Sequence, residues 1–244
     1  MLEKSEVLEF VEDNRQCSYF EDKTSDIRYK YVEKCSYEEQ KAMLQRGWRR
    51  FGYMFFVPEC KECDECKTLR IDIKNFRFSS SQRRVLNKNK DIKFYIQEPT
   101  VTYEHIDLFN TYHQYMTQKK GWEKNEVDIQ EYYNAYVAGA NNIGKEILFF
   151  KDNNLVAVAL IDFFDDAISS VYCYYDPNYI KYSLGQFSIL VQIQLAKEYN
   201  IPYVYLGYWI KDHFSLGYKN RYKPFEILQN RPNLDEKTIW KYYD

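Results

Sequence analysis

Three closely spaced cysteines are the plainest chemical feature of this sequence. Cys60, Cys63 and Cys66 stand at C-x₂-C-x₂-C spacing, directly after an aromatic run that follows a pair of arginines. Thiolates suit Zn²⁺ or an iron–sulfur cluster, and both normally take four protein ligands. Cys17 is the candidate for the fourth ligand, with Cys35 in reserve. The spacing therefore predicts a metal or cluster site, and the alternative is three partly buried small residues in a turn.

A strongly basic segment follows the cysteines. Residues 67–93 hold nine lysines and arginines against two acidic residues, a local net charge of +7, whereas the whole chain has a net charge of −2. Charge of this density neutralises phosphates, and Arg83 and Arg84 stand in a short helix that Ser79 can cap. The segment therefore predicts an anion-binding surface, and the alternative is a solvated charged face.

Several common catalytic motifs are missing. The sequence has no H-E-x-x-H, G-x-S-x-G or P-loop motif, which disfavours metalloprotease, serine hydrolase and nucleoside triphosphatase activity. Its three histidines, His105, His113 and His213, are expected to serve packing or the surface. An enzyme made from these residues must rely on positioning and hydrogen bonding.

The chain is expected to be soluble, cytoplasmic and without a membrane partner. Its first twenty residues carry acidic residues throughout and do not resemble a signal peptide, and no apolar run is long enough to span a bilayer. Six cysteines in 244 residues are too few for a disulfide scaffold, which favours reduced thiols.

The elements that position these residues fall into two regions. Residues 1–99 form a smaller α+β region that carries the cysteine cluster: a helix over 36–47 with a Ser36–Glu39 capping box, and strands over 49–57, 67–78 and 91–99. The cysteines lie on the loop between the first two of these strands.

Residues 100–244 follow a different pattern. Two helices over 102–121 and 128–139 precede three antiparallel strands, a strongly apolar helix with Ser183 as N-cap, a strand over 203–210, and a tail of loop and short strand. This order is that of the N-acetyltransferase-like (GNAT-like) core, so the predicted fold class is α/β (α+β). In that fold two strands splay apart before the buried helix, and an acyl group passes to an amine in the gap.

Five segments together resemble the aminoacyl-tRNA protein transferase family. In the same order as in that family, they are "GWRRFGYMFFVPECKECDECKTLRIDI", "FRFSSSQRRVLNKNKD", "YYDPNYIKYSLGQF", "YVYLGYWI" and "YKNRYKPFEIL". The resemblance covers about residues 17–228. The short length and the form of the cysteine cluster are similar to the bacterial leucyl-transferring branch, whereas the eukaryotic arginyltransferases are longer and arrange their cysteines differently.

The resemblance implies leucine transfer from leucyl-tRNA to the α-amine of proteins that begin with Asp or Glu, which marks them for degradation by the N-end rule. It also implies a cysteine cluster that binds iron–sulfur or zinc in relatives. An aminoacyl ester is already activated, and an α-amine has a pKa of about 7.7 to 8.0, so no further cofactor is required.

Site residues are assigned on the family motifs and on position. Asp176 and Tyr175, at the end of the splayed strand, are expected to orient the amine or accept its proton. Lys219 matches the family motif and is the first choice for the acidic N-terminal side chain, with Arg221 as the second. Further substrate contacts are expected at Tyr222, Trp209, Tyr208 and Gly185.

Contacts with the tRNA are expected from the two arginine pairs. Arg83 and Arg84 should hold acceptor-stem phosphates or the terminal adenosine. Arg49 and Arg50 are further contacts, or a structural pair that holds the cysteine loop.

Three alternatives remain open. The donor could be arginyl-tRNA, because physics alone does not decide the transferred residue. An acetyl-coenzyme A dependent N-acetyltransferase would need more glycines than Gly185 beside the apolar helix. A non-catalytic zinc-knuckle RNA-binding protein would use only residues 1–99.

Overall fold

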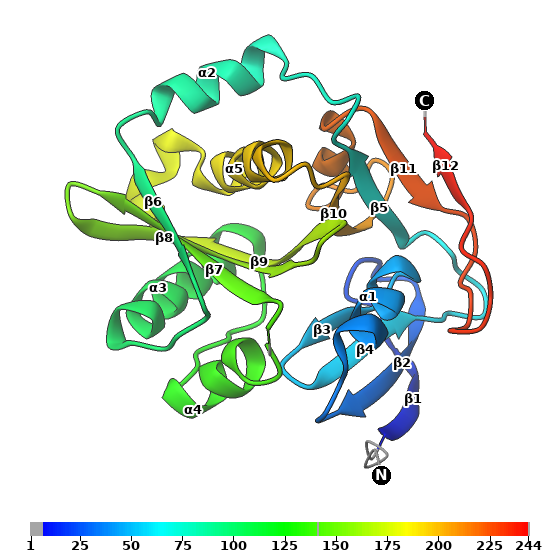
Figure 1. The fold of residues 1–244 in the computed structure, drawn as a ribbon. Coiled ribbons are helices and arrows are strands. Elements are labelled where there is room, and N and C mark those ends of the chain that lie inside the picture. Colours follow the sequence, from blue (N-terminus) through cyan, green and yellow to red (C-terminus); the bar gives the residue numbers. More distant parts are fainter. Residues whose placement is uncertain (1–6, 141, 244) are drawn as a thin grey trace.

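Two β-sheets organise the chain (Figure 1). The computed structural model describes residues 7–140 and 142–243 and contains a four-stranded sheet, an eight-stranded sheet and helices on both faces of the larger one. This arrangement confirms the predicted α/β class. None of the helices described is both long and apolar enough to cross a bilayer.

The small sheet is antiparallel, in the order β1-β2-β4-β3. Its strands are β1 (Val7–Gln16), β2 (Thr24–Val32), β3 (Arg49–Phe51) and β4 (Met54–Pro58). Helix α1 (Tyr37–Gln45) packs beside it, and the predicted capping box of Ser36 and Glu39 is present. The strand predicted over 49–57 is two strands around a turn, and the β1–β2 hairpin was not predicted.

The large sheet has the order β12-β11-β5-β10-β9-β8-β7-β6, and only the β9–β10 pair is parallel. Its strands are β5 (Lys67–Asp72), β6 (Lys93–Gln97), β7 (Gly144–Lys151), β8 (Asn154–Phe163), β9 (Ala167–Tyr175), β10 (Tyr203–Trp209), β11 (Phe225–Leu228) and β12 (Trp240–Tyr242). The predicted antiparallel meander is confirmed as β7, β8 and β9.

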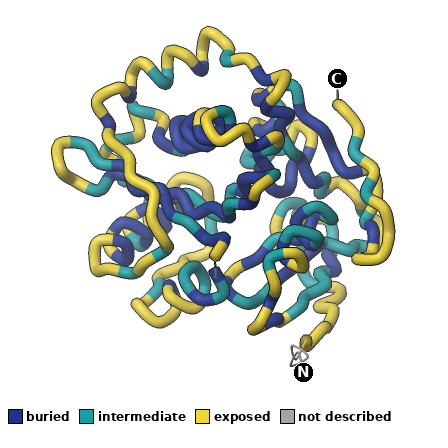
Figure 2. The backbone as a smooth tube through the Cα atoms, in the orientation of Figure 1, coloured by how far each residue is buried: buried dark blue, intermediate teal, exposed yellow. Residues whose placement is uncertain are grey.

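Helices cover both faces of the large sheet. Helix α5 (Leu184–Glu198) packs on one face with α2 (Ser80–Lys88) beyond it, and α3 (Tyr103–Lys120) and α4 (Ile129–Tyr132) lie on the other. Alternation along β7 divides the core, since Ile147 packs in the α5 cluster and Leu148 in the α3 cluster. Figure 2 shows that burial is concentrated in α5 and the central strands.

Short helical turns complete the fold. A π-helical turn (Tyr133–Val137) continues α4, and 3₁₀ turns span Pro177–Tyr182 and Gly217–Arg221. Ser183 stands at the N-cap of α5 as predicted, but its φ is +55° and its side chain makes no capping hydrogen bond to the helix.

The sheets do not divide the chain at residue 99. Strand β5 pairs with β10 and β11, and β6 pairs with β7, so both belong to the large sheet although they precede residue 99. As a statement about independent folding units, the division into 1–99 and 100–244 stays a prediction.

Two glycines join the small sheet to the helical face of the large one. Gly52, in the β3–β4 turn, has φ +56°, and a Cβ there would lie 2.1 Å from the Asn134 carbonyl oxygen. Gly139 has φ +67°, and a Cβ there would lie 2.5 Å from the Gly52 carbonyl oxygen. Backbone therefore packs directly on backbone at this contact.

Replacing Gly52 with alanine should lower the free energy of unfolding by at least about 2 kcal/mol, from left-handed strain together with the backbone clash. Gly121→Ala is the matched control: its φ is +68°, but nothing lies within 4 Å of the added Cβ, so it should cost only about 1 kcal/mol. Urea unfolding of both variants measures the difference. Equal losses would show that the Gly52 contact adds nothing to the strain.

Candidate active site

Strands β9 and β10 separate in the middle of the large sheet, as the N-acetyltransferase-like order predicts. They pair in parallel only from Tyr203 opposite Ala167 to Tyr205 opposite Ser169. Beyond that point, β9 continues along β8, and β10 continues along β5 after a bulge at Leu206. Helix α5 contacts both strands. Backbone groups on the facing edges of the two strands are therefore left free of ladder pairing.

Arg49 reaches from β3 to the point where these strands separate. Its guanidinium donates to Ser169 Oγ at 2.7 Å and to the Ser170 carbonyl of β9. On the other side, β10 has Gly207 at φ +75°, and a Cβ there would lie 3.3 Å from Arg49 Nε. Burial lowers the pKa of Arg49. A residue of the small sheet thus contacts both separated strands of the large one.

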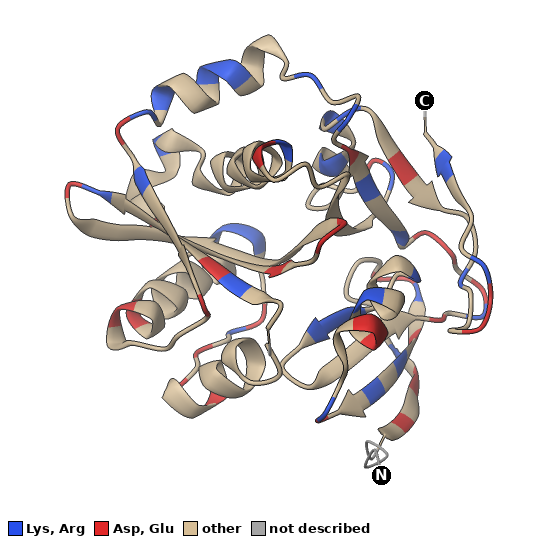
Figure 3. Cartoon of the chain, in the orientation of Figure 1, with Lys and Arg blue, Asp and Glu red and all other residues tan. Residues whose placement is uncertain are grey.

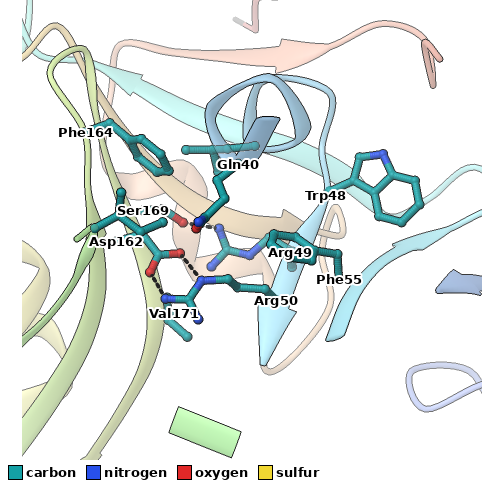
Figure 4. Close-up of a pocket in the computed structure, with 11 residues that line it drawn as sticks. Gln40, Trp48, Arg49, Arg50, Phe55, Asp162, Phe164, Ser169 and Val171 are labelled. Atoms are coloured by element: carbon teal, nitrogen blue, oxygen red, sulfur yellow. Dashed lines mark hydrogen bonds and ion pairs between the residues drawn. The ribbon is translucent and has the colours of Figure 1, made fainter. Parts of the chain in front are cut away.

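A small cavity adjoins Arg49 (Figure 4). It is lined by Arg49, Arg50, Gln40, Asp162 and Ser169, among others, and its volume is about 10 Å³. That space suffices for about one water molecule. A larger depression, about 460 Å³, lies at the outer edge of the sheet beside Lys93 and Tyr95, and contains none of the predicted site residues.

Lys219 lies in the 3₁₀ turn Gly217–Arg221 and is 9 % exposed. Its Nζ donates to the Tyr208 carbonyl at 2.5 Å. Burial, and then the charge of Arg49, lower the pKa of Lys219 to about 7. Arg49 and Lys219 therefore contact consecutive residues of β10, Gly207 and Tyr208. Within residues 7–140 and 142–243, neither cation forms an ion pair with a carboxylate.

A row of polar side chains connects β9 with α5, in which Ser170 is half-buried and Ser188 and Gln192 are buried. Ser170 Oγ donates to Gln192 Oε1 at 2.5 Å, and Gln192 Nε2 donates to Ser188 Oγ at 3.4 Å. Sequence reasoning missed these residues, although polar positions in an otherwise apolar helix were a usable signal. They fix the backbone of β9 beside Arg49.

The two residues predicted to be catalytic are placed differently. Tyr175 is half-buried, its ring centroid lies 4.9 Å from that of Tyr112, and a Cβ on Gly185 would lie 3.5 Å from its ring. Burial raises the pKa of Tyr175. Asp176 accepts the backbone N–H of Asn178 at 2.8 Å and so caps the 3₁₀ turn Pro177–Tyr182. A role in proton transfer stays a prediction for both.

Trp209 and Tyr222 belong to the core, each 2 % exposed. Trp209 Nε1 donates to the Gly217 carbonyl at 3.2 Å and so supports the turn that carries Lys219. Tyr208 is also buried, and its hydroxyl donates to the Gly47 and Phe56 carbonyls. The rings of Trp209, Tyr208 and Tyr222 are therefore enclosed by protein and pack in the core, and their predicted substrate contacts stay a prediction.

The four arginines predicted to contact tRNA separate into three kinds. Arg50 is buried, and its Nε and Nη2 both bond to the Asp162 carboxylate. This ion pair leaves little of Arg50 open to a tRNA, and the predicted contact stays a prediction. Arg49 lies at the separated strands. Arg83 and Arg84 are exposed on α2, and the basic residues of that helix are visible in Figure 3. Arg221 is also exposed.

The cysteine loop connects β4 to β5, between two strands as predicted. Burial raises the pKa of Cys66 to about 12, and the neighbouring thiols of Cys17, Cys60 and Cys63 contribute to the same shift. Arg231 donates to the carbonyls of Cys60 and Cys63 at 3.5 and 3.2 Å. Four thiols are a suitable donor set for zinc, but no three metal-binding side chains of the described residues are placed to hold an ion. The metal stays a prediction.

Comparison with known proteins covers nearly the whole chain. Residues 15–84 match the family described as arginine-tRNA-protein transferase, N terminus, and residues 104–229 match its C terminus. The chain is 47% identical over 227 residues to the aspartate/glutamate leucyltransferase of Campylobacter jejuni serotype O:6, covering 93% of this chain and 95% of the relative. It is 44% identical over 238 residues to that of Helicobacter hepaticus, covering 98% and 99%.

Solved structures resemble the chain more distantly. The crystal structure of FemX is 9% identical with a TM-score of 0.49, covering 76% of this chain and 65% of FemX. The PaiA N-acetyltransferase of Thermoplasma acidophilum is 14% identical with a TM-score of 0.37, covering 62% and 99%.

Proposed function

Because this chain belongs to the arginine-tRNA-protein transferase family, we propose that it transfers leucine from leucyl-tRNA to the α-amine of proteins that begin with Asp or Glu. The names of the relatives supply the donor and the acidic acceptors. The observation that carries the proposal is Lys219, a buried cation at the separated strands with no carboxylate partner among the described residues. The product has an N-terminal leucine and is directed to degradation by the N-end rule.

The proposed reaction is an aminolysis. The α-amine attacks the leucyl ester carbonyl, the new C–N bond forms, and the ester C–O bond breaks so that the electron pair leaves on the ribose oxygen. The amine gives up a proton and the ribose oxygen gains one. Tyr175 and Asp176 are the proposed groups for orienting the amine and accepting its proton. No cofactor is required, because the ester is already activated.

Lys219 is the proposed recognition residue for the acidic side chain. A buried cation with unused N–H donors is stabilised by a carboxylate at hydrogen-bond distance. An alanine or asparagine side chain leaves the desolvated cation without a counter-charge, so substrates with neutral N-terminal residues bind weakly.

The experiment supplies purified protein with labelled leucyl-tRNA or arginyl-tRNA and with peptides that begin with Asp, Glu or Ala. Leucine incorporation into the Asp and Glu peptides supports the proposal. Incorporation of arginine instead would favour the arginyl donor. If as much leucine entered the Ala peptide as entered the Asp and Glu peptides, the protein would not select for an acidic N-terminal residue. Peptide acetylation from acetyl-coenzyme A, or tRNA binding without any transfer, would identify the other two alternatives.

The α2 surface is proposed to hold tRNA phosphates. Replacing Arg84 with glutamine should weaken leucyl-tRNA binding about 3- to 10-fold and reduce the slope of log Kd against log salt by about 1, since one phosphate contact is lost. Lys124→Gln is the control, because Lys124 is exposed on the α3–α4 loop, away from α2. Filter binding at several salt concentrations measures both. Equal effects of the two substitutions would mean that general charge, and not α2, governs binding.

We further propose that the protein acts in the cytoplasm, where aminoacyl-tRNA is made.

We also propose that Cys17 and the three cysteines of the β4–β5 loop, Cys60, Cys63 and Cys66, hold zinc or an iron–sulfur cluster. Elemental analysis of the purified protein tests for the metal. No step of the proposed reaction passes through that loop.

A further inference from the structure

We propose that Arg49 is a recognition residue for the acidic N-terminal side chain and forms, with Lys219, a two-cation pocket for its carboxylate. This inference rests on the proposed transfer to Asp and Glu N-termini. It moves Arg49 from the tRNA surface, where the sequence motif suggested it, into the acceptor site.

The two cations converge on one short piece of backbone. Arg49 lies against Gly207, and Lys219 Nζ donates to the carbonyl of the next residue, Tyr208. Their charges are close enough that Arg49 contributes to the lowered pKa of Lys219. They come from different parts of the chain, β3 and the 3₁₀ turn after β10, so the fold itself brings them together.

Both cations retain unused donors. A guanidinium has five N–H donors, and with the described part of the chain Arg49 makes two hydrogen bonds, to Ser169 and Ser170. An ammonium has three, and Lys219 makes one with the same residues. All three acceptors are neutral oxygens. Donors of both groups therefore remain for a further acceptor between them.

The protein does not supply the missing anion from its own described residues. Asp162 lies on the cavity beside Arg49 and its charge acts on Arg49, but its two carboxylate oxygens are bonded to Arg50. The half-buried Arg49 and the buried Lys219 repel each other, and a carboxylate bound by both would offset that repulsion. The arrangement therefore suits an anion brought by the substrate.

A carboxylate fits this place better than a phosphate of the tRNA. The cavity beside Arg49 is only about 10 Å³, room for about one water molecule, so a group as bulky as a phosphodiester is excluded there. A carboxylate is smaller and stands at the end of a flexible side chain. A phosphodiester carries a nucleoside on either side and suits exposed cations such as Arg83 and Arg84. Binding of a tRNA phosphate at Arg49 is the competing outcome of the test.

The test compares Arg49→Gln with the wild-type full chain, using peptides that begin with Asp, Glu or Asn and leucyl-tRNA. The substitution should raise KM for the Asp and Glu peptides about 30-fold or more, as expected for loss of one partner of a buried charged hydrogen bond. The Asn peptide should change less than about twofold, and the Kd for leucyl-tRNA should stay the same. Arg49→Lys should recover part of the loss, because it restores the charge without the forked donors.

Three results would overturn the inference. A rise of tenfold or more in the tRNA Kd with unchanged peptide KM would assign Arg49 to a phosphate. Equal losses on Asp and Asn peptides would reduce Arg49 to a structural role. If Arg49→Lys has a KM for the Asp peptide as high as that of Arg49→Gln, the positive charge at this position does not contribute to recognition.

Gly207→Ala provides a second route if Arg49→Gln does not fold. It keeps the arginine but places a methyl group 3.3 Å from Nε, at a φ of +75°, and should raise the same KM values with the tRNA Kd unchanged. Unchanged KM values would count against the inference. Failure of the proposed function looks different, because the wild-type chain would then transfer no leucine to any acidic peptide.

Discussion

Replacing Lys219 with methionine should lower kcat/KM for peptides that begin with Asp or Glu by about 100-fold or more, because the carboxylate loses a buried, charged hydrogen-bond partner. The same change should stabilise the folded protein near neutral pH, since methionine has a similar length and carries no desolvated charge. Initial-rate kinetics and urea unfolding of one preparation measure both effects. Lys223→Met, at an exposed lysine four residues further on, is the control and should alter neither quantity appreciably.

The pH dependence of stability follows from the sign of the Lys219 shift. Its pKa is about 7 in the folded protein against an ordinary value of 10.5, so the unfolded chain binds more protons between these values. Stability therefore rises with pH across this window and falls as pH decreases toward 7. The full difference is about 4 to 5 kcal/mol.

Two charged or titratable groups that influence Lys219 do not change this window. Arg49 remains protonated throughout, and the pKa of Cys66 is about 12, so that thiol stays neutral. The difference between wild type and Lys219→Met in urea unfolding should shrink steadily from pH 7.5 to pH 9.5. A constant difference would show that Lys219 does not titrate in that range.

Substitution of Arg50 alone should destabilise the protein by about 3 to 5 kcal/mol, because it leaves the Asp162 carboxylate buried without its partner. Arg50→Met tests this. Asp162→Leu should cost a similar amount, and the double variant should recover most of the loss, since an apolar pair of similar volume replaces the ion pair. Thermal or urea unfolding of the three variants gives the coupling free energy.

An exposed ion pair provides the matched control for the buried one. Lys67 and Asp64 lie 2.5 Å apart with side chains 29% and 74% exposed, so Lys67→Met should cost less than about 1 kcal/mol. If Arg50→Met instead leaves stability unchanged but weakens leucyl-tRNA binding, the original tRNA assignment of Arg50 would be right and the burial argument wrong.

Local rules of sequence succeeded where the determining contacts are local. The Ser36–Glu39 capping box that begins α1 and the Ser79 cap that begins α2 both act within a few residues. The β1–β2 hairpin was missed because the apolar residues of β1 (Val7, Leu8, Phe10 and Val11) fall on both faces of the strand, so the sequence shows no apolar–polar alternation there. A strand is recognised in a sequence by the alternation of apolar and polar residues that burial of one face requires.

The candidate site was predicted only in part, because long-range packing decides the rest. Arg49 and Arg50 are neighbours in a strand, where successive side chains point to opposite faces. One therefore reaches the separated strands and the other reaches Asp162. The sequence could predict that they diverge but not what each would meet. Lys219 was found from its motif, whereas its burial depends on β10 and on a turn held by Trp209.

The place of β5 in the large sheet limits how the chain can be divided. This strand comes before residue 100 in the sequence but lies between β10 and β11, which both come after residue 200. A fragment that starts at residue 100 would split the sheet at that point and uncover two strand edges, which template aggregation. The same fragment would lack the arginine that spans β9 and β10. The two parts of the chain that match the family are therefore not independent of each other. In a chimera of two relatives joined near residue 100, β5 from one relative would have to pack between β10 and β11 from the other.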